Sequence, residues 1–90
     1  MGAPTPVILK VTAPERGRVV VEASDGRRYS ADLTSFSTVY CYPASGEAWS
    51  EVRPDADGLG LVWTSRFEVH VDQVIGLADR VELIQQTASG

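Results

Sequence analysis

The chain has 90 residues, of which 43% are hydrophobic and 22% charged, and its formal net charge is −4. These values indicate one globular domain, exclude a disordered acidic chain and argue against non-specific binding to nucleic acid or anionic membranes. Cys41 is the only cysteine, so no internal disulfide can form. We find neither a signal-peptide pattern nor an apolar stretch near the length of about 20 residues that spans a bilayer, and we expect a cytoplasmic protein.

The first residues predict the start of an antiparallel meander. Residues 1–6 contain two prolines and predict a flexible tail. In residues 7–13, apolar Val7, Leu9 and Val11 recur at period two, which indicates a strand. Residues 14–18 carry a proline and a glycine, so they turn the chain toward the next strand.

The strongest local signal is a β-hairpin around Asp25-Gly26, a dipeptide that favours tight turns between strands. A two-residue loop there would place charged side chains on the buried face. A three-residue loop that ends at Gly26, in a left-handed conformation, instead sets Glu22 opposite Arg28. That register gathers six side chains on one face as a core: Val19, Val21, Ala23, Tyr29, Ala31 and Leu33.

The middle of the chain is less regular. Residues 33–43 are rich in turn-forming serine and threonine, and give no clear period. Ser45 can cap a short helix from Gly46 to Glu51. Helical spacing would turn three side chains of this segment toward the core: Ala48, Trp49 and Val52.

Two further strands follow a turn at Asp55–Gly58. Residues 59–64 and 67–72 each alternate between apolar and polar side chains, and they are separated by a short turn. Trp63 lies in the first of these strands and is expected in the core. The pair therefore predicts a second hairpin.

The pattern changes to helical spacing from Asp72, a potential N-cap, through Leu77. Residues 78–84 fit either the continuation of that helix or a last strand, and residues 85–90 form a polar tail. We therefore predict a single α+β domain at residues 7–84. Its antiparallel sheet has about five strands, a meander of three and then a hairpin, with one or two short helices packed on it.

Five features follow one another in a distinctive order: Glu22–Gly26, Asp32-Leu33, Trp49, Val52 and Val62-Trp63. In this order they resemble a small bacterial family known as domain of unknown function 2442. The resemblance covers about residues 7–78, and departs from the family pattern at Thr64–Arg66 and at Val71 or Asp72, where the family often has an Asn-Gly type turn and a proline. It implies a helix packed on an antiparallel sheet and no assigned active site. Family members occur alone, joined to a DNA-binding helix-turn-helix, or beside a partner gene in an arrangement suggestive of toxin and antitoxin.

One residue combination could support covalent catalysis. Cys41 and His70 are the only thiol and the only imidazole, and Asp72 could orient the histidine. However, His70 and Asp72 fall on the outward face of a predicted strand, and Cys41 lies in a segment expected to be partly buried. We therefore expect no catalytic residues and no enzyme.

Charged clusters give no ligand site either. Aligning Gly58 with the invariant glycine of a calcium loop puts Arg53 and Thr64 at ligand positions, where both are unsuitable. We therefore interpret Asp55–Gly58 as a solvated turn and expect no metal or cofactor. Four arginines lie at opposite ends of one predicted strand, about 17 Å apart at roughly 3.3 Å per residue, so they favour local ion pairs over one anion site. They are Arg16, Arg18, Arg27 and Arg28.

Aromatic side chains offer the best candidate contact surface. Tyr40, Tyr42 and Trp49 could form an exposed patch that binds a protein partner. We predict a non-enzymatic interaction module that binds a protein partner or self-associates, in part because free strand edges can pair with another chain. The alternative is a regulatory or antitoxin-like protein of a bacterial two-gene module that contacts nucleic acid, which the spacing of the arginines disfavours. We infer no small-molecule substrate and no membrane partner.

Overall fold

The structure, a computed structural model, describes residues 6–84. The predicted tails at 1–6 and 85–90 lie outside these residues, except for Pro6. The described chain forms a four-stranded and a three-stranded sheet, both antiparallel, together with two short α-helices. The predicted α+β class is confirmed, and the strands are divided between two sheets.

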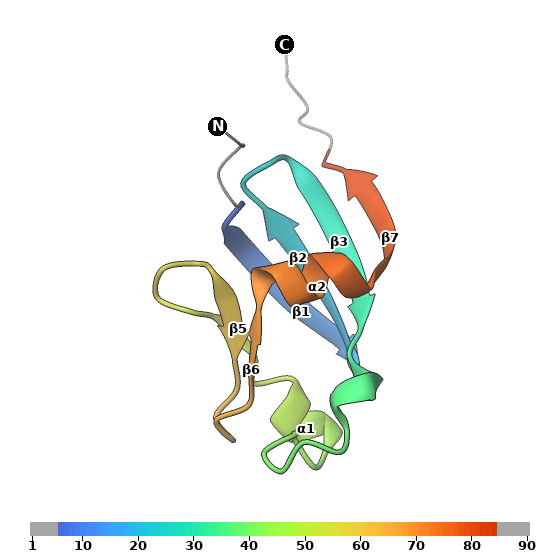
Figure 1. Ribbon diagram of the computed structural model, residues 1–90, viewed down its shortest axis with the longest axis vertical. Helices are drawn as coiled ribbons and strands as arrows, with labels where there is room; N and C mark the ends of the chain where they lie inside the picture. Colours follow the sequence, from blue (N-terminus) through green and yellow to red (C-terminus); the bar gives the residue numbers. More distant parts are fainter. Residues whose placement is uncertain (1–5, 85–90) are drawn as a thin grey trace.

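The larger sheet has the strand order β1-β2-β3-β7 (Figure 1). It contains the predicted three-stranded meander, formed by β1 (Ile8–Glu15), β2 (Arg18–Ala23) and β3 (Arg27–Asp32). The fourth strand, β7 (Ala78–Leu83), pairs antiparallel with β3. Of the two alternatives for the last segment, the strand is therefore the one that forms.

The hairpin between β2 and β3 has the predicted register. Glu22 pairs with Arg28, and Gly26 has a φ of 80°, in the left-handed region that glycine tolerates. The N–H of Gly26 donates to the carbonyl of Ala23 at 3.1 Å, which closes the three-residue loop. All six side chains predicted on the core face are buried.

Strand β1 departs from a simple alternation at Leu9. Ile8 pairs with Ala23 while Lys10 pairs with Glu22, so Leu9 is an extra residue in β1 and forms a β-bulge. Leu9 is 66% exposed, whereas Ile8 is buried. The predicted strand is therefore present, but its period-two alternation does not continue through Leu9. The bulge moves the side chains that precede it to the opposite face of the sheet.

The smaller sheet joins β4 (Arg53–Pro54), β5 (Gly60–Val62) and β6 (Glu68–His70) in chain order. Strands β5 and β6 are shorter than predicted. A Cβ at Gly60 would lie 2.9 Å from the carbonyl oxygen of Val69, so only glycine lets the two strands approach this closely. The predicted second hairpin is thus present.

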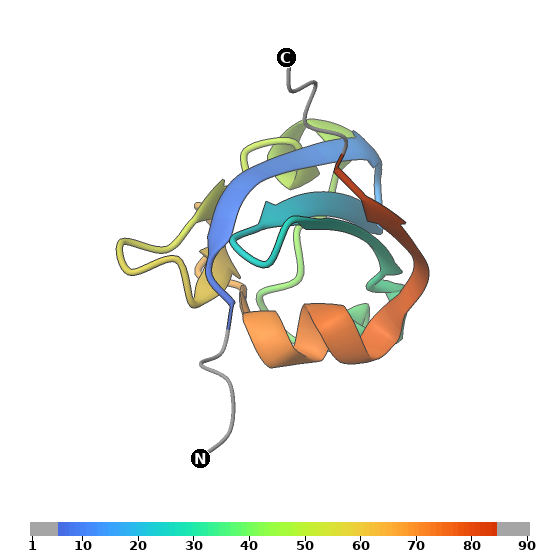
Figure 2. The same ribbon diagram turned by 90° about the horizontal axis from the view of Figure 1, so that it is seen from above.

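Helix α2 (Val71–Leu77) follows β6 directly. Its N-cap is His70, two residues before the predicted cap at Asp72, and the imidazole Nδ1 accepts the N–H of Asp72 at 3.1 Å. Seen from above, the large sheet curls and α2 crosses its concave side (Figure 2). Val71 and Val74 are fully buried there. No helix among residues 6–84 is long and apolar enough to cross a membrane.

An aromatic cluster of Tyr42, Trp49, Trp63 and Phe67 packs next to α1 (Gly46–Trp49). Ser45 is the N-cap of α1, as predicted. The indole N–H of Trp63 donates to the carbonyl of Trp49 at 2.9 Å, and that of Trp49 donates to the carbonyl of Arg18 at 3.0 Å. These bonds link the small sheet to α1 and α1 to the large sheet. Trp63 is in the core, as predicted.

Candidate functional site

The outer edge of β7 carries backbone groups that pair with no strand among residues 6–84. The N–H of Ile84 donates to the carbonyl of Gly26 at 2.9 Å, so Ile84 faces β3. Alternate residues of an antiparallel strand direct their N–H and C=O to the same neighbour, so Glu82 faces β3 as well. The N–H and C=O of Val81 and Leu83 therefore point away from β3, toward a side with which no strand of residues 6–84 pairs.

Apolar side chains accompany this edge on the inner face of the sheet. Val81 lies opposite Tyr29, a buried core residue, yet Val81 itself is 52% exposed. Leu83 is 75% exposed, and Leu77, at the end of α2, is 38% exposed. The core thus continues to the edge of β7 without being covered there by any other described element.

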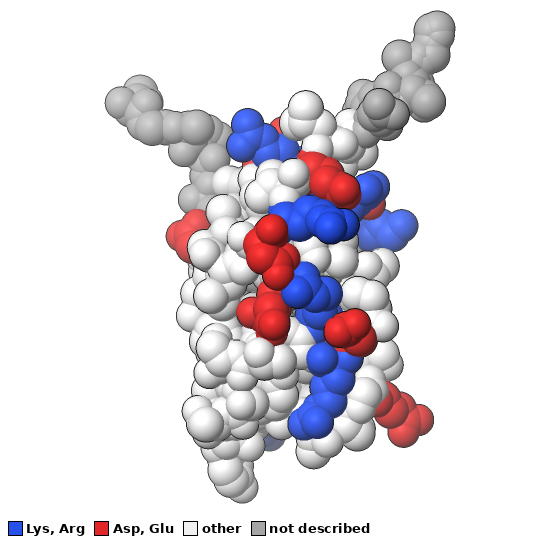
Figure 3. All heavy atoms as spheres, turned by 90° about the vertical axis from the view of Figure 1, so that its right-hand side faces the viewer, with Lys and Arg blue, Asp and Glu red and all other residues white. Residues whose placement is uncertain are grey.

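The outer face of the same sheet carries charges in alternation. One row across the strands runs from Lys10 through Glu22 and Arg28 to Glu82, so its signs alternate from β1 to β7. Figure 3 shows basic and acidic side chains alternating along the face on which β7 lies. Arg28 contacts both of its acidic neighbours, Glu22 at 3.3 Å and Glu82 at 3.5 Å.

A second ion pair fastens the start of β7. The two guanidinium nitrogens of Arg18 donate to the two carboxylate oxygens of Asp79 at 3.0 and 2.8 Å. These hydrogen bonds lower the pKa of Asp79 and raise that of Arg18. The prediction that the arginines form ion pairs is confirmed for Arg18 and Arg28, and both pairs join β7 to other strands of the sheet.

The three residues of the predicted aromatic patch are not brought together on the surface. Trp49 is only 1% exposed, so the expectation that it forms part of an exposed patch is wrong. It packs against Trp63 with ring centroids 4.8 Å apart, because α1 turns it into the core. Tyr42 is half-buried against Trp49, and Tyr40 is fully exposed in the loop before α1. Tyr40 is thus the member of the set that a partner can reach in full.

The Cys41 and His70 residues have separate structural surroundings. The carbonyl of Cys41 accepts the hydroxyl of Ser65 at 2.7 Å, while the imidazole of His70 caps α2. Gln73 completes that cap, because its side-chain oxygen accepts the N–H of His70 at 2.9 Å. His70 therefore has a helix-capping role that sequence reasoning missed, although a capping side chain followed by Gln three residues later is a known signal.

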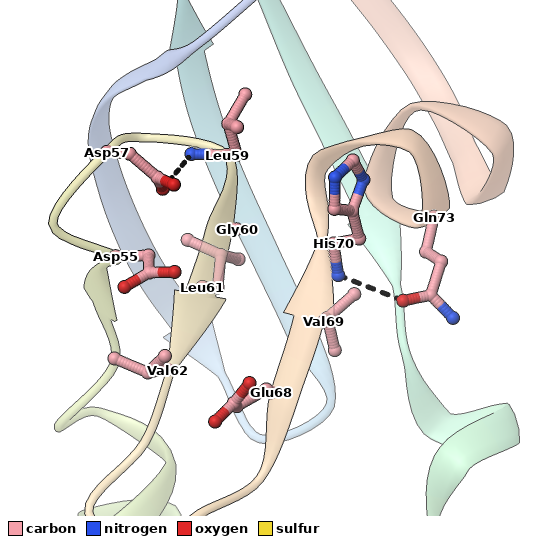
Figure 4. A pocket seen from close by; sticks show the side chains of 10 residues that line it. All are labelled: Asp55, Asp57, Leu59, Gly60, Leu61, Val62, Glu68, Val69, His70 and Gln73. Atoms are coloured by element: carbon pink, nitrogen blue, oxygen red, sulfur yellow. Dashed lines mark hydrogen bonds between the residues drawn. The ribbon is translucent and has the colours of Figure 1, made fainter.

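An open groove of about 370 Å³ lies on the smaller sheet, between the Asp55–Gly58 turn and the start of α2 (Figure 4). Most of the acidic and polar side chains around it bind backbone N–H groups. Asp57 accepts the N–H of Leu59 at 3.1 Å, and Asp55 accepts that of Ala56 at 2.7 Å. Gly58 has a φ of 74°, so the interpretation of this segment as a turn is confirmed. The part of the chain that is described holds no group of three His, Cys, Asp or Glu side chains placed to bind a metal.

Sequence reasoning pointed to free strand edges but did not identify β7. The alternation Arg80-Val81-Glu82-Leu83 is the signal that could have done so. It was ambiguous because the same residues also continue the helical spacing of the preceding segment.

Comparison with known proteins found no family model, no curated protein and no solved structure that matches this chain. The resemblance to domain of unknown function 2442 therefore stays a prediction. The candidate site rests on geometry alone.

Proposed function

We propose that this protein is a non-enzymatic, cytoplasmic interaction module that binds another polypeptide by strand addition at the outer edge of β7. The observation that carries the proposal is the combination of outward N–H and C=O groups at Val81 and Leu83 with their exposed apolar side chains. In strand addition, backbone hydrogen bonds supply affinity and alternate side chains supply specificity. Both are available on β7.

The pairing of β7 with β3 supports this role, because it already orders the strand. Asp79 forms an ion pair with Arg18, and Glu82 forms one with Arg28. A strand that is already ordered loses little conformational entropy when a second strand pairs with it, which favours binding. Tyr40 lies on a different loop and is the best alternative anchor, since its side chain is fully exposed.

A photo-crosslinking amino acid placed at one position at a time tests the proposal in the source cells. We expect a covalent adduct with a polypeptide when the probe replaces Leu83, and its loss when Val81→Pro is added. Proline at 81 removes an N–H that faces away from β3, and edge strands tolerate proline at such a position.

Leu9 is the matched control position, because it is 66% exposed on the strand at the opposite end of the sheet. Adducts from a probe at Tyr40 or Leu9, with none from position 83, would contradict strand addition at β7. An adduct from 83 that survives Val81→Pro would contradict it as well.

A further inference from the structure

We infer that the polypeptide that adds to β7 is a second copy of this chain, paired antiparallel about a two-fold axis that passes through Val81. This inference rests on the proposed function and names its partner. The joined sheets would then form one continuous sheet of eight strands, because each copy supplies its four-stranded sheet. Most homodimers are two-fold symmetric and bring the same surface of each copy into contact, as this pairing does.

The backbone geometry permits pairing about Val81. Its N–H and C=O point away from β3, so Val81 of one copy can exchange two hydrogen bonds with Val81 of the other. The side on which this happens is open, since β7 is the last strand of the sheet and no described element lies beyond it (Figure 2).

Charge selects this register among its neighbours. With Val81 opposite Val81, Arg80 of each copy lies opposite Glu82 of the other, which forms two cross-strand ion pairs on the outer face. Moving the axis to Glu82 sets glutamate against glutamate, and moving it to Arg80 sets arginine against arginine. Like charges directly opposite each other destabilise a sheet, so only the register about Val81 satisfies both residues.

This arrangement also extends the pattern within one copy. The row that ends in Glu82 already alternates in sign across the sheet. Arg80 of the second copy would be the next member of that row and would keep the alternation. Charged side chains on an edge strand normally discourage pairing with other chains. Here the same two charges admit a copy of the chain in one register and oppose a shifted one.

The inner face gains from the same pairing. The Val81 side chain lies on the same face of the sheet as buried Tyr29, so the Val81 side chains of the two copies would meet on the inner face of the joined sheet. Leu83 lies on that side too, and both residues are largely exposed in the single chain. In this register Leu83 lies opposite Asp79 of the other copy, so the apolar contact between the two strands comes from the Val81 pair, where the uncovered core reaches the edge.

Charge exchange between positions 80 and 82 tests the register. We expect the purified wild type to be a dimer by light scattering after size exclusion. Arg80→Glu alone, or Glu82→Arg alone, replaces two attractive pairs with two repulsive ones. Because each cross-strand charge pair changes association by roughly two- to fivefold, and four such factors compound here, either variant raises the dissociation constant of the dimer by at least about sixteenfold.

Mixing the two variants restores complementarity. A chain with glutamate at 80 and 82 faces a chain with arginine at both positions, so we expect a heterodimer with an affinity close to that of the wild type. Glu22→Arg is the matched control, because it also removes a contact of Arg28 but lies away from the edge, and it should leave the dimer intact. The heterodimer also shows that both variants fold.

A wild type that is monomeric at about 1 mM overturns the inference. So do single variants that dimerise like the wild type, or variants that stay monomeric when mixed. These outcomes leave the proposed function standing if the probe at Leu83 still yields an adduct with a different polypeptide. A dimer that is unaffected by either charge change, together with no adduct from a probe at Leu83, refutes the symmetric pairing and the proposed strand addition at β7 alike.

Discussion

The burial of Trp49 leads to a sharp prediction for Trp49→Ala. The side chain is 1% exposed, packs on Trp63 and donates to the carbonyl of Arg18. Removing a buried tryptophan costs about 3–5 kcal/mol in lost burial and cavity formation. The carbonyl left without its donor adds to that cost. A domain of this size is stable by roughly 5–13 kcal/mol, so the substitution should remove a large part of the stability.

Urea unfolding followed by far-ultraviolet circular dichroism measures the change. We expect the midpoint to fall sharply without a large change in slope, because the slope reports the surface exposed on unfolding. Trp49→Phe keeps most of the ring volume but loses the indole donor, and should cost about 2 kcal/mol. This second variant stays informative if Trp49→Ala does not fold.

Tyr40→Ala is the control, since Tyr40 is fully exposed and its removal should change stability by less than about 0.5 kcal/mol. A loss of less than about 1 kcal/mol for Trp49→Ala would refute the inference that Trp49 links α1 to the large sheet. It would also reopen its assignment to an exposed contact patch.

Three further predictions concern local features. Gly17→Ala should destabilise by about 1–3 kcal/mol in thermal unfolding, because Gly17 has a φ of 92° and a Cβ there would lie 2.5 Å from the Thr34 methyl group. His70→Ala should cost about 1 kcal/mol and reduce the protection of α2 amides from hydrogen exchange, since it removes the N-cap. Asp79→Asn should lower stability at neutral pH, and its deficit should vanish in acid. The contact with Arg18 lowers the folded-state pKa of Asp79, so its stabilisation is present above the ordinary carboxyl pKa of about 4 and is lost below it.

The structure moves the candidate site from an aromatic patch to a strand edge. Tyr40, Tyr42 and Trp49 were chosen for their residue types, which are frequent at interfaces. Aromatic residues are equally frequent in small cores, and only the path of the chain distinguishes the two. In this protein α1 turns Trp49 inward, whereas the edge of β7 has exposed apolar surface next to backbone groups with which no strand in the described part of the chain pairs.

Local chemistry was enough to determine the hairpin of β2 and β3. The Asp25-Gly26 turn and the alternation on both sides fix its register, because those interactions join residues close in sequence. The capped helix α1 and the turn at Asp55–Gly58 follow from the same kind of short-range signal.

The tertiary structure alone decided the elements that depend on distant partners. Residues 78–83 form a strand because β3 offers them a free edge 47 to 56 residues earlier in the chain, and no local periodicity contains that information. The bulge at Leu9 depends likewise on where β2 and the Gly58 turn hold β1. Periodicity in the sequence indicates which side chains can share a face of a strand or helix. Which strand pairs with which is decided by packing across the whole molecule.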